Sequence, residues 1–133
     1  MRLVIDTNIW MHYLIQSSLK HLDLIITDSD TEILFSKELI NEFLDVSARP
    51  KFTRYFTSED VSELLLLLES RFPPIEVKSV VNACRDERDN FLLALAKDGN
   101  ADYLITGDND LLIIKNFEKT KIVSLAEFEN LSG

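Results

Sequence analysis

The sequence contains little glycine, proline or cysteine. Its 133 residues include three Gly, three Pro and a single Cys, Cys84. So few glycines and prolines leave little room for linkers or low-complexity segments, and we expect residues 1–133 to form a single domain. One cysteine excludes an intrachain disulfide and a zinc site built from cysteines. The cytoplasm is the expected compartment of such a chain.

Long hydrophobic runs are also missing. No stretch approaches the roughly 18 apolar residues that a membrane-spanning helix needs, so we expect no membrane association. The first apolar run, Leu3–Ile5, is followed at once by Asp6. A signal peptide would need a longer apolar region at this position, and we expect none.

Positive charge is scarce, with 14 Lys and Arg against 23 Asp and Glu, a net charge of −9. This balance argues against nucleic-acid binding through a general basic surface. It does not exclude a nuclease, because divalent cations bound by clustered acids reverse the local field. A basic partner protein would suit the same surface. One segment combines basic and aromatic residues and is either a nucleic-acid contact or a solvated loop: Arg49, Lys51 and Arg54, interleaved with Phe52, Tyr55 and Phe56.

What the sequence does contain is an alternation of short apolar runs with helical patterns. The runs predict strands at Leu3–Ile5, Glu32–Ser36, Ala101–Thr106 and Lys121–Ser124, and a short strand or extended segment at Ile75–Val77. Helical patterns cover Asn8–Ile26 with a break near Gln16–Ser18, Lys37–Ala48, Val61–Phe72, Asp89–Lys97 and the residues after Ser124. Apolar strands without a period of two indicate a parallel sheet buried on both faces. The sequence therefore predicts a three-layer α/β/α sandwich with a central, mostly parallel sheet of four or five strands.

Two acids stand directly after predicted strands. Asp6 follows the first strand, and Asp108 follows the strand at Ala101–Thr106. Because ligands of parallel sheets bind outside the carboxyl ends of the strands, both acids can face one crevice. Each of them alone could simply cap the next helix. Two acids at matching positions favour a functional site.

Further acids lie on or before predicted helices. Glu42 lies near the border of the apolar face of its helix, and Glu38, one turn earlier, is the competing candidate. Asp86 and Asp89 both precede the helix at Asp89–Lys97, where either could serve as a turn or first-turn acid. All are hard oxygen ligands without neighbouring His or Cys. A metal at such a site would be Mg²⁺ or Mn²⁺, not Zn²⁺.

Other chemistries find less support. His12 and His21 lie in the first helical stretch and are expected to be surface or packing residues. The three scattered glycines form no phosphate-binding loop. No Ser or Cys has a His or Asp partner at a recognisable spacing, which argues against covalent catalysis.

Four motifs together resemble the PIN-domain ribonucleases, particularly the small VapC-like toxins of toxin–antitoxin pairs. They are VIDTNIW, SKELINEFLDV, CRDERDNFLLALA and YLITGDNDLL, and the resemblance covers nearly the whole chain. It implies a metal site made of three or four acids. The matching acids are Asp6, Glu42, Asp89 and Asp108, with Asp110 at a further, more variable position. The matching supporting positions are Thr7, Asn8 and Thr106.

The chain departs from the family pattern at one position. Many relatives have a basic residue just before the fourth acid, where this chain has Gly107, so one phosphate contact is missing. Between Asp86 and Asp89, the resemblance favours Asp89 because it opens the helix directly.

The resemblance implies an endoribonuclease that uses Mg²⁺ or Mn²⁺ to hydrolyse RNA phosphodiester bonds, a toxin neutralised by a cognate antitoxin protein. The alternative is a catalytically weak PIN-like module that binds RNA or protein, which Gly107 and the acidic surface would suit. A phosphatase with an aspartyl nucleophile is disfavoured, because such enzymes usually carry a second Asp where this chain has Asn8. The leucine-rich stretch Val61–Phe72 indicates either a homodimer contact or a buried core helix.

Overall fold

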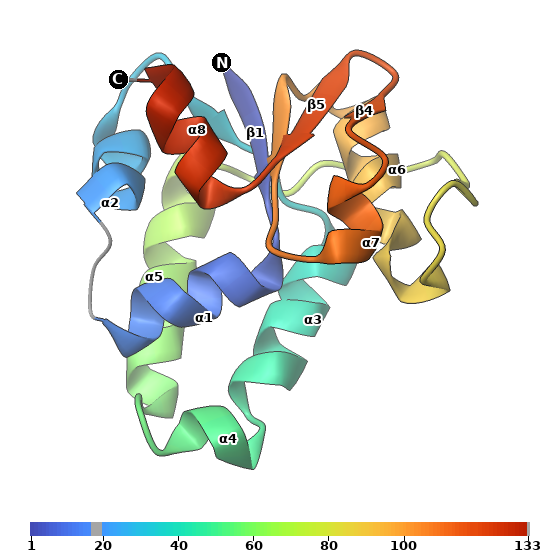
Figure 1. The fold of residues 1–133 in the computed structure, drawn as a ribbon. Helices are drawn as coiled ribbons and strands as arrows, with labels where there is room; N and C mark the ends of the chain where they lie inside the picture. Colours follow the sequence, from blue (N-terminus) through green and yellow to red (C-terminus); the bar gives the residue numbers. More distant parts are fainter. Residues whose placement is uncertain (17–19, 133) are drawn as a thin grey trace.

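The computed structural model describes residues 1–16 and 20–132, without the side chains of residues 20, 21 and 132 (Figure 1). Within these residues the strands are β1 (Arg2–Ile5), β2 (Glu32–Ile33), β3 (Tyr103–Ile105), β4 (Asn116–Phe117) and β5 (Thr120–Val123). The α-helices are α1 (Thr7–Ile15), α2 (Lys20–Thr27), α3 (Lys37–Ser47), α4 (Pro50–Thr53), α5 (Ser58–Arg71), α6 (Asn90–Asp98), α7 (Asn109–Leu112) and α8 (Leu125–Ser132). A 3₁₀ turn, η1 (Glu87–Asp89), precedes α6.

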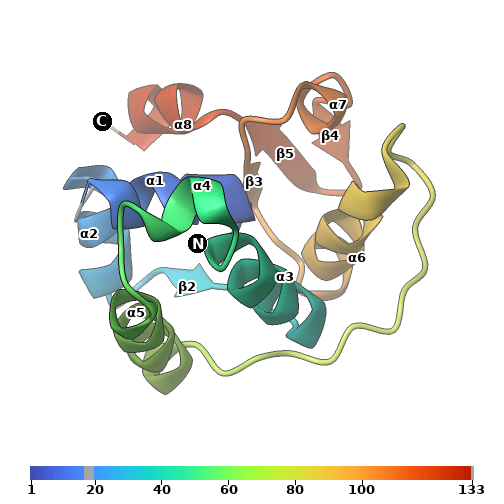
Figure 2. The ribbon, with the colours of Figure 1, turned by 90° about the horizontal axis from the view of Figure 1, so that it is seen from below.

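The strands form one sheet in the order β2-β1-β3-β5-β4. All neighbouring strands are parallel except β4, which pairs antiparallel with β5. Val4 pairs with Leu104, and Leu104 pairs with Ile122, so the central strands run side by side with their carboxyl ends at one edge. Helices α3, α5 and α6 lie on one side of the sheet and α8 lies on the other (Figure 2). The predicted α/β fold with a mostly parallel sheet is confirmed.

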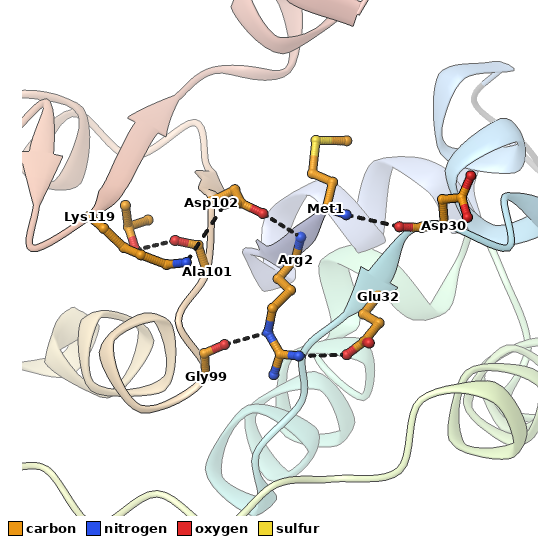
Figure 3. A network of polar contacts seen from close by, with 9 residues as sticks. Met1, Arg2, Asp30, Glu32, Gly99, Ala101, Asp102 and Lys119 are labelled. Carbon is orange, nitrogen blue, oxygen red and sulfur yellow. Dashed lines mark hydrogen bonds and ion pairs between the residues drawn. The ribbon is translucent and has the colours of Figure 1, made fainter.

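Ion pairs and hydrogen bonds tie the strands together at the opposite edge, where the parallel strands begin (Figure 3). The Arg2 guanidinium donates from Nε to the Gly99 carbonyl at 2.6 Å and from Nη1 to Glu32 Oε2 at 2.8 Å. The Arg2 backbone N–H donates to Asp102 Oδ2 at 2.8 Å, and Lys119 Nζ lies 3.8 Å from Asp102 Oδ1. This network fixes β1 between β2 and the start of β3, and it leaves the carboxyl ends open for a site.

Local sequence signals place several helix ends correctly. Thr57 and Asp60 form a reciprocal capping box at the start of α5, and Ser124 and Glu127 form another before α8. Both pairs are joined by side chain-to-backbone hydrogen bonds that satisfy free N–H groups of the first turn. Helix α3 ends at Ser47, before Pro50 as predicted.

Other elements differ from the sequence prediction. The strand expected at Glu32–Ser36 ends at Ile33, although the Leu34 N–H still donates to the Leu3 carbonyl. Ile75–Val77 is an extended segment and not a strand, joined to Phe35 by one backbone hydrogen bond. The helix expected from Asp89 begins one residue later, after η1. Helices α4 and α7 and strand β4 were not predicted, because two- to four-residue elements carry little periodicity.

The break expected in the first helical stretch begins at Gln16, the C-cap of α1, and its remainder lies outside the described residues. The leucine-rich α5 is partly buried. Leu64, Leu65 and Leu68 belong to the core, whereas Leu66 is 69% exposed and Leu67 is 46% exposed. No helix among the described residues is long and apolar enough to cross a membrane.

Candidate active site

Asp6 is the buried centre of the site. It follows β1, its backbone N–H donates to the Ile105 carbonyl of β3, and its side chain is almost inaccessible. The Thr106 hydroxyl donates to Asp6 Oδ2 at 2.6 Å. Burial raises the pKa of Asp6, the Thr106 hydrogen bond offsets part of this effect, and the nearby charges of Glu42 and Asp108 raise it further.

Helix α3 brings Glu42, and not Glu38, to this centre. The Thr7 hydroxyl, in the first turn of α1, donates to Glu42 Oε2 at 2.6 Å. Because Thr7 directly follows Asp6, this bond holds the Glu42 carboxylate beside the end of β1. Glu38 is exposed and lines a separate cavity of about 240 Å³ with Val77. Of the two candidate glutamates, Glu42 therefore lies at the centre of the site and Glu38 lies outside it.

Asp108 follows the carboxyl end of β3 and lies near Asp6. Its backbone N–H donates to the Thr106 hydroxyl oxygen at 3.0 Å, so one threonine hydroxyl contacts both Asp6 and Asp108. Asp108 then caps α7, because its Oδ1 accepts the Asp110 N–H at 2.9 Å. Asp110 is half-buried in the first turn of α7.

Asp86 and Asp89 have different partners. Asp86 caps η1 and binds Arg88, accepting from the Arg88 backbone N–H at 3.0 Å and from its guanidinium at 3.0 and 3.2 Å. These bonds lower the pKa of Asp86. The Asp89 Oδ2 atom is buried without a hydrogen-bond partner among the described residues. Burial and the nearby carboxylates, first Asp108 and then Asp6, raise the pKa of Asp89 to about 8.

The turn that carries Asp89 is held by two residues that the sequence did not indicate as part of the site. Asn90 is buried, and its Oδ1 accepts the Cys84 backbone N–H at 2.8 Å. The Cys84 thiol lies 3.7 Å from the Asp110 carbonyl oxygen. Cys84 is buried in the core, and burial and the neighbouring acids raise the pKa of its thiol. The only sequence signal for these contacts is the adjacency of Asn90 to Asp89.

A cleft extends from Asp108 along the surface between α1 and α4. Its volume is about 560 Å³. It is lined by Asn8, Ile9, Met11, His12, Ile15, Lys51, Phe52, Gly107 and Asp108, and we call it the α1–α4 cleft. Of the three basic residues singled out in the sequence, only Lys51 lines it. Arg49 pairs with Asp45 at 3.1 Å, and the Arg54 guanidinium lies over the Tyr55 ring. His12 is exposed at the cleft, whereas the His21 side chain lies outside the described residues.

The acids are chemically suitable ligands for a hard divalent cation, although they do not surround a single cation position. In residues 1–16 and 20–132, no three Asp, Glu, His or Cys side chains are placed to hold one cation together. The donors are nevertheless all oxygens, and one of them is buried without a partner. Burial, together with repulsion from the neighbouring carboxylates, raises the pKa of Asp6 and Asp89. A cation would relieve both the repulsion and the unpaired oxygen.

Comparison with known proteins identifies the family. Residues 2–110 match the family model described as the PIN domain. The chain belongs to the PIN domain family. Among curated proteins no match was found. One solved structure with a similar fold is the crystal structure of VapBC2 from Rickettsia felis, bound to a DNA fragment from the VapBC2 promoter. That match has a TM-score of 0.56 and 17% identity, and covers 92% of this chain and 97% of the other.

Proposed function

We propose that this PIN-domain protein is an endoribonuclease that depends on Mg²⁺ or Mn²⁺. The observation that carries the proposal is the buried, unpartnered Oδ2 of Asp89 beside Asp108, in a cluster that also contains Asp6 and Glu42. Asp6 is buried, and Glu42, Asp89 and Asp108 are half-buried. Bringing carboxylates together away from water is costly unless a cation or a proton compensates their charge. Such a cost is expected at a functional site.

The cation would be held by Asp6, Glu42, Asp89 and Asp108, with Asp110 as a further donor. When bound, it would lower the pKa of an attacking water and neutralise charge at the scissile phosphate. The chain's own residues orient the donors: Thr106 fixes Asp6 and Asp108, and Thr7 fixes Glu42. Asp89 has to release its proton before it can bind a cation.

We further propose that the protein is a toxin whose partner is a cognate antitoxin. The four sequence motifs and the shared fold with the VapBC2 structure support this role. The acidic surface, with a net charge of −9, suits a basic partner. The exposed Leu66 and Leu67 of α5 offer apolar area for a homodimer or for the antitoxin.

A second candidate is a PIN-like module that binds RNA or protein without cleaving it. It is favoured by the lack, among the described residues, of three acids already placed around one cation position. Isothermal titration calorimetry with Mn²⁺ separates the two functions. The nuclease should bind Mn²⁺ with release of the Asp89 proton, whereas the binding module should bind no Mn²⁺ at millimolar concentration.

The nuclease proposal is tested by a matched pair of variants on one helix. Purified wild type should cleave fluorescent single-stranded RNA when Mn²⁺ or Mg²⁺ is present, and EDTA should stop it. Glu42→Gln should lower the cleavage rate by about a hundredfold or more, since it removes a proposed ligand. Glu38→Gln, one turn away and outside the cluster, should cleave within about twofold of wild type. Equal activity of all three proteins would contradict the assigned site.

A further inference from the structure

An extended segment runs around the outside of α3 and α6 on its way from α5 to α6 (Figure 2). It consists of residues 73–83, which form neither helix nor strand, and we call it the strap. Half-buried side chains alternate along it with exposed ones. Within residues 1–16 and 20–132, its only backbone-to-backbone hydrogen bond joins the Ile75 N–H to the Phe35 carbonyl at 2.8 Å. Side chains of other elements must therefore hold most of the strap in place.

Helix α6 holds the strap through one side chain at each end of the helix. At the carboxyl end, Asp98 Oδ2 accepts the backbone N–H of Lys78 at 2.6 Å and that of Ser79 at 2.9 Å. The Ser79 hydroxyl donates to the other carboxylate oxygen, Asp98 Oδ1. At the amino end, Asn90 Oδ1 accepts the backbone N–H of Cys84, the residue that follows the strap, at 2.8 Å. The helix and the strap are thus tied together at two separate points.

Only the contact made by Asn90 closes the loop that carries a site acid. This loop, residues 84–90, leaves the strap, passes through η1 and enters α6, and the hydrogen bond joins its first residue to its last. Cys84 and Asn90 are both buried, so water does not compete for the bond. Asp89 directly precedes Asn90 in the closed loop. Losing the bond would free the Cys84 end of the loop and loosen the turn in which Asp89 lies.

Cys84 also connects this loop to α7. Its thiol lies 3.7 Å from the Asp110 carbonyl oxygen, in the first turn of the helix that Asp108 caps. Asp89 and Asp108 repel each other when both are ionised, so these two acids do not by themselves keep the loop against α7. The contacts from Asn90 to Cys84 and from Cys84 to Asp110 involve neutral groups. They can therefore hold the loop against α7 without a bound cation.

We propose that Asn90 is a positioning residue of the proposed metal site. By accepting the Cys84 N–H it keeps the 84–90 loop closed and holds the Asp89 carboxylate beside Asp108. Asp98 holds the same strap from the same helix, but its contacts lie outside the loop and leave the position of Asp89 unchanged. This inference rests on the proposed nuclease function, because it concerns a ligand of the proposed cation.

Three variants separate positioning from a general contribution to stability. Asn90→Leu keeps the branched shape of the side chain but removes the oxygen that accepts the Cys84 N–H. Asn90→Asp keeps an acceptor oxygen at that place and should restore the hydrogen bond. The matched control is Asp98→Ala, which removes the other contact of α6 with the strap and leaves the 84–90 loop closed.

The first measurement is amide hydrogen exchange of the metal-free, ¹⁵N-labelled proteins, followed by NMR so that single residues are resolved. In Asn90→Leu the Cys84 amide should exchange roughly tenfold faster than in wild type, because a buried N–H has lost its acceptor. In Asn90→Asp it should exchange as in wild type. Asp98→Ala should accelerate exchange at Lys78 and Ser79 and leave the Cys84 amide unchanged.

The second measurement is Mn²⁺ binding by isothermal titration calorimetry. Asn90→Leu should bind Mn²⁺ about 10- to 100-fold more weakly than wild type, the usual cost of losing a group that orients a metal ligand. Asn90→Asp should bind Mn²⁺ more tightly than Asn90→Leu does. Asp98→Ala should match wild type within about twofold, even where its melting temperature is lower. If Asn90→Leu fails to fold, Asn90→Ser, with a side chain one atom shorter, replaces it with the same expected results.

The outcomes separate this proposal from the nuclease proposal. If wild type binds Mn²⁺ and Asn90→Leu binds it equally well, the positioning role is wrong and the nuclease proposal stands. An equal loss of Mn²⁺ affinity in Asp98→Ala and Asn90→Leu would also overturn it, because the loss would then come from a loosened strap and not from the opened loop. If wild type binds neither Mn²⁺ nor Mg²⁺, the nuclease proposal fails and the positioning role fails with it.

Discussion

Thr106 donates its hydroxyl proton to Asp6 across the gap between β1 and β3, at 2.6 Å. The same oxygen accepts the backbone N–H of Asp108 at 3.0 Å. One buried hydroxyl therefore connects the acids at the ends of two neighbouring strands. The contact requires both strands to end at the same level, which the pairing of Ile5 with Ile105 provides.

The first prediction concerns Thr106. Thr106→Val keeps the shape of the side chain but leaves two buried polar partners unsatisfied, which should lower the free energy of unfolding by about 1–3 kcal/mol. Thr106→Ser keeps the hydroxyl and should lose only about 1 kcal/mol for its missing methyl group. Urea unfolding of the metal-free proteins measures both values. A valine variant as stable as wild type would show that the hydrogen bond contributes nothing.

The second prediction follows from the raised pKa of Asp89. The folded protein holds the Asp89 proton up to about pH 8, whereas the unfolded chain releases it near the ordinary carboxyl pKa of about 4. The folded state therefore binds more protons in this window, and the stability of the EDTA-treated protein should fall as pH rises from about 4 to 8. Calorimetric melting temperatures across this range should show the decline, and Asp89→Asn should reduce it, leaving the part that the raised pKa of Asp6 contributes.

The matched control for Asp89 lies on the same turn. The Arg88 hydrogen bonds lower the pKa of Asp86, so this group favours folding at high pH and loses that contribution as pH falls below about 4. Asp86→Asn should leave the decline between pH 4 and 8 unchanged. If Asp86→Asn flattened the curve and Asp89→Asn did not, the assignment of the two acids would be reversed.

The third prediction compares two glycines with opposite surroundings. A Cβ on Gly99 would lie 2.6 Å from Leu34 Cδ1 and 3.0 Å from the Leu95 carbonyl oxygen. Gly99→Ala should therefore destabilise the protein by about 1–3 kcal/mol through overpacking. Gly107→Ala meets nothing within 4 Å and should change stability by less than about 0.5 kcal/mol. Equal effects in thermal unfolding would contradict the packing described around the end of α6.

Features that follow a known sequence pattern could be predicted, and contacts without such a pattern could not. The capping pairs Thr57–Asp60 and Ser124–Glu127 are three residues apart, so a local pattern reveals them. The placement of Asp6 and Asp108 at one sheet edge followed from parallel strands. The choice between Asp86 and Asp89 depends on which of them Arg88 binds in a 3₁₀ turn, a geometry without a periodic signal.

The α1–α4 cleft shows the same limit. Its basic residue comes from a segment that the sequence suggested as either a nucleic-acid contact or a solvated loop, and the folded chain forms a single turn of helix there, α4. The Arg49–Asp45 pair lies four residues apart and was accessible from the sequence, whereas the presence of Lys51 and Asp108 in the lining of one cleft depends on the packing of α1, α3 and α4. Tertiary packing, and not local propensity, therefore determines which of the three basic side chains lines the cleft.

The last prediction concerns Thr7, which holds Glu42 from the first turn of α1. Thr7→Val removes the 2.6 Å hydrogen bond while keeping a β-branched side chain of similar volume. Losing the partner that orients a ligand typically costs 10- to 100-fold in metal affinity or activity, so Mn²⁺ binding by calorimetry should weaken by about that factor. Thr7→Ser retains the donor and should bind Mn²⁺ within about threefold of wild type. Because the Thr7 hydroxyl donates to the Glu42 carboxylate, Thr7→Val in a Glu42→Gln background should have little further effect, whereas additive losses would place the Thr7 side chain in a different role.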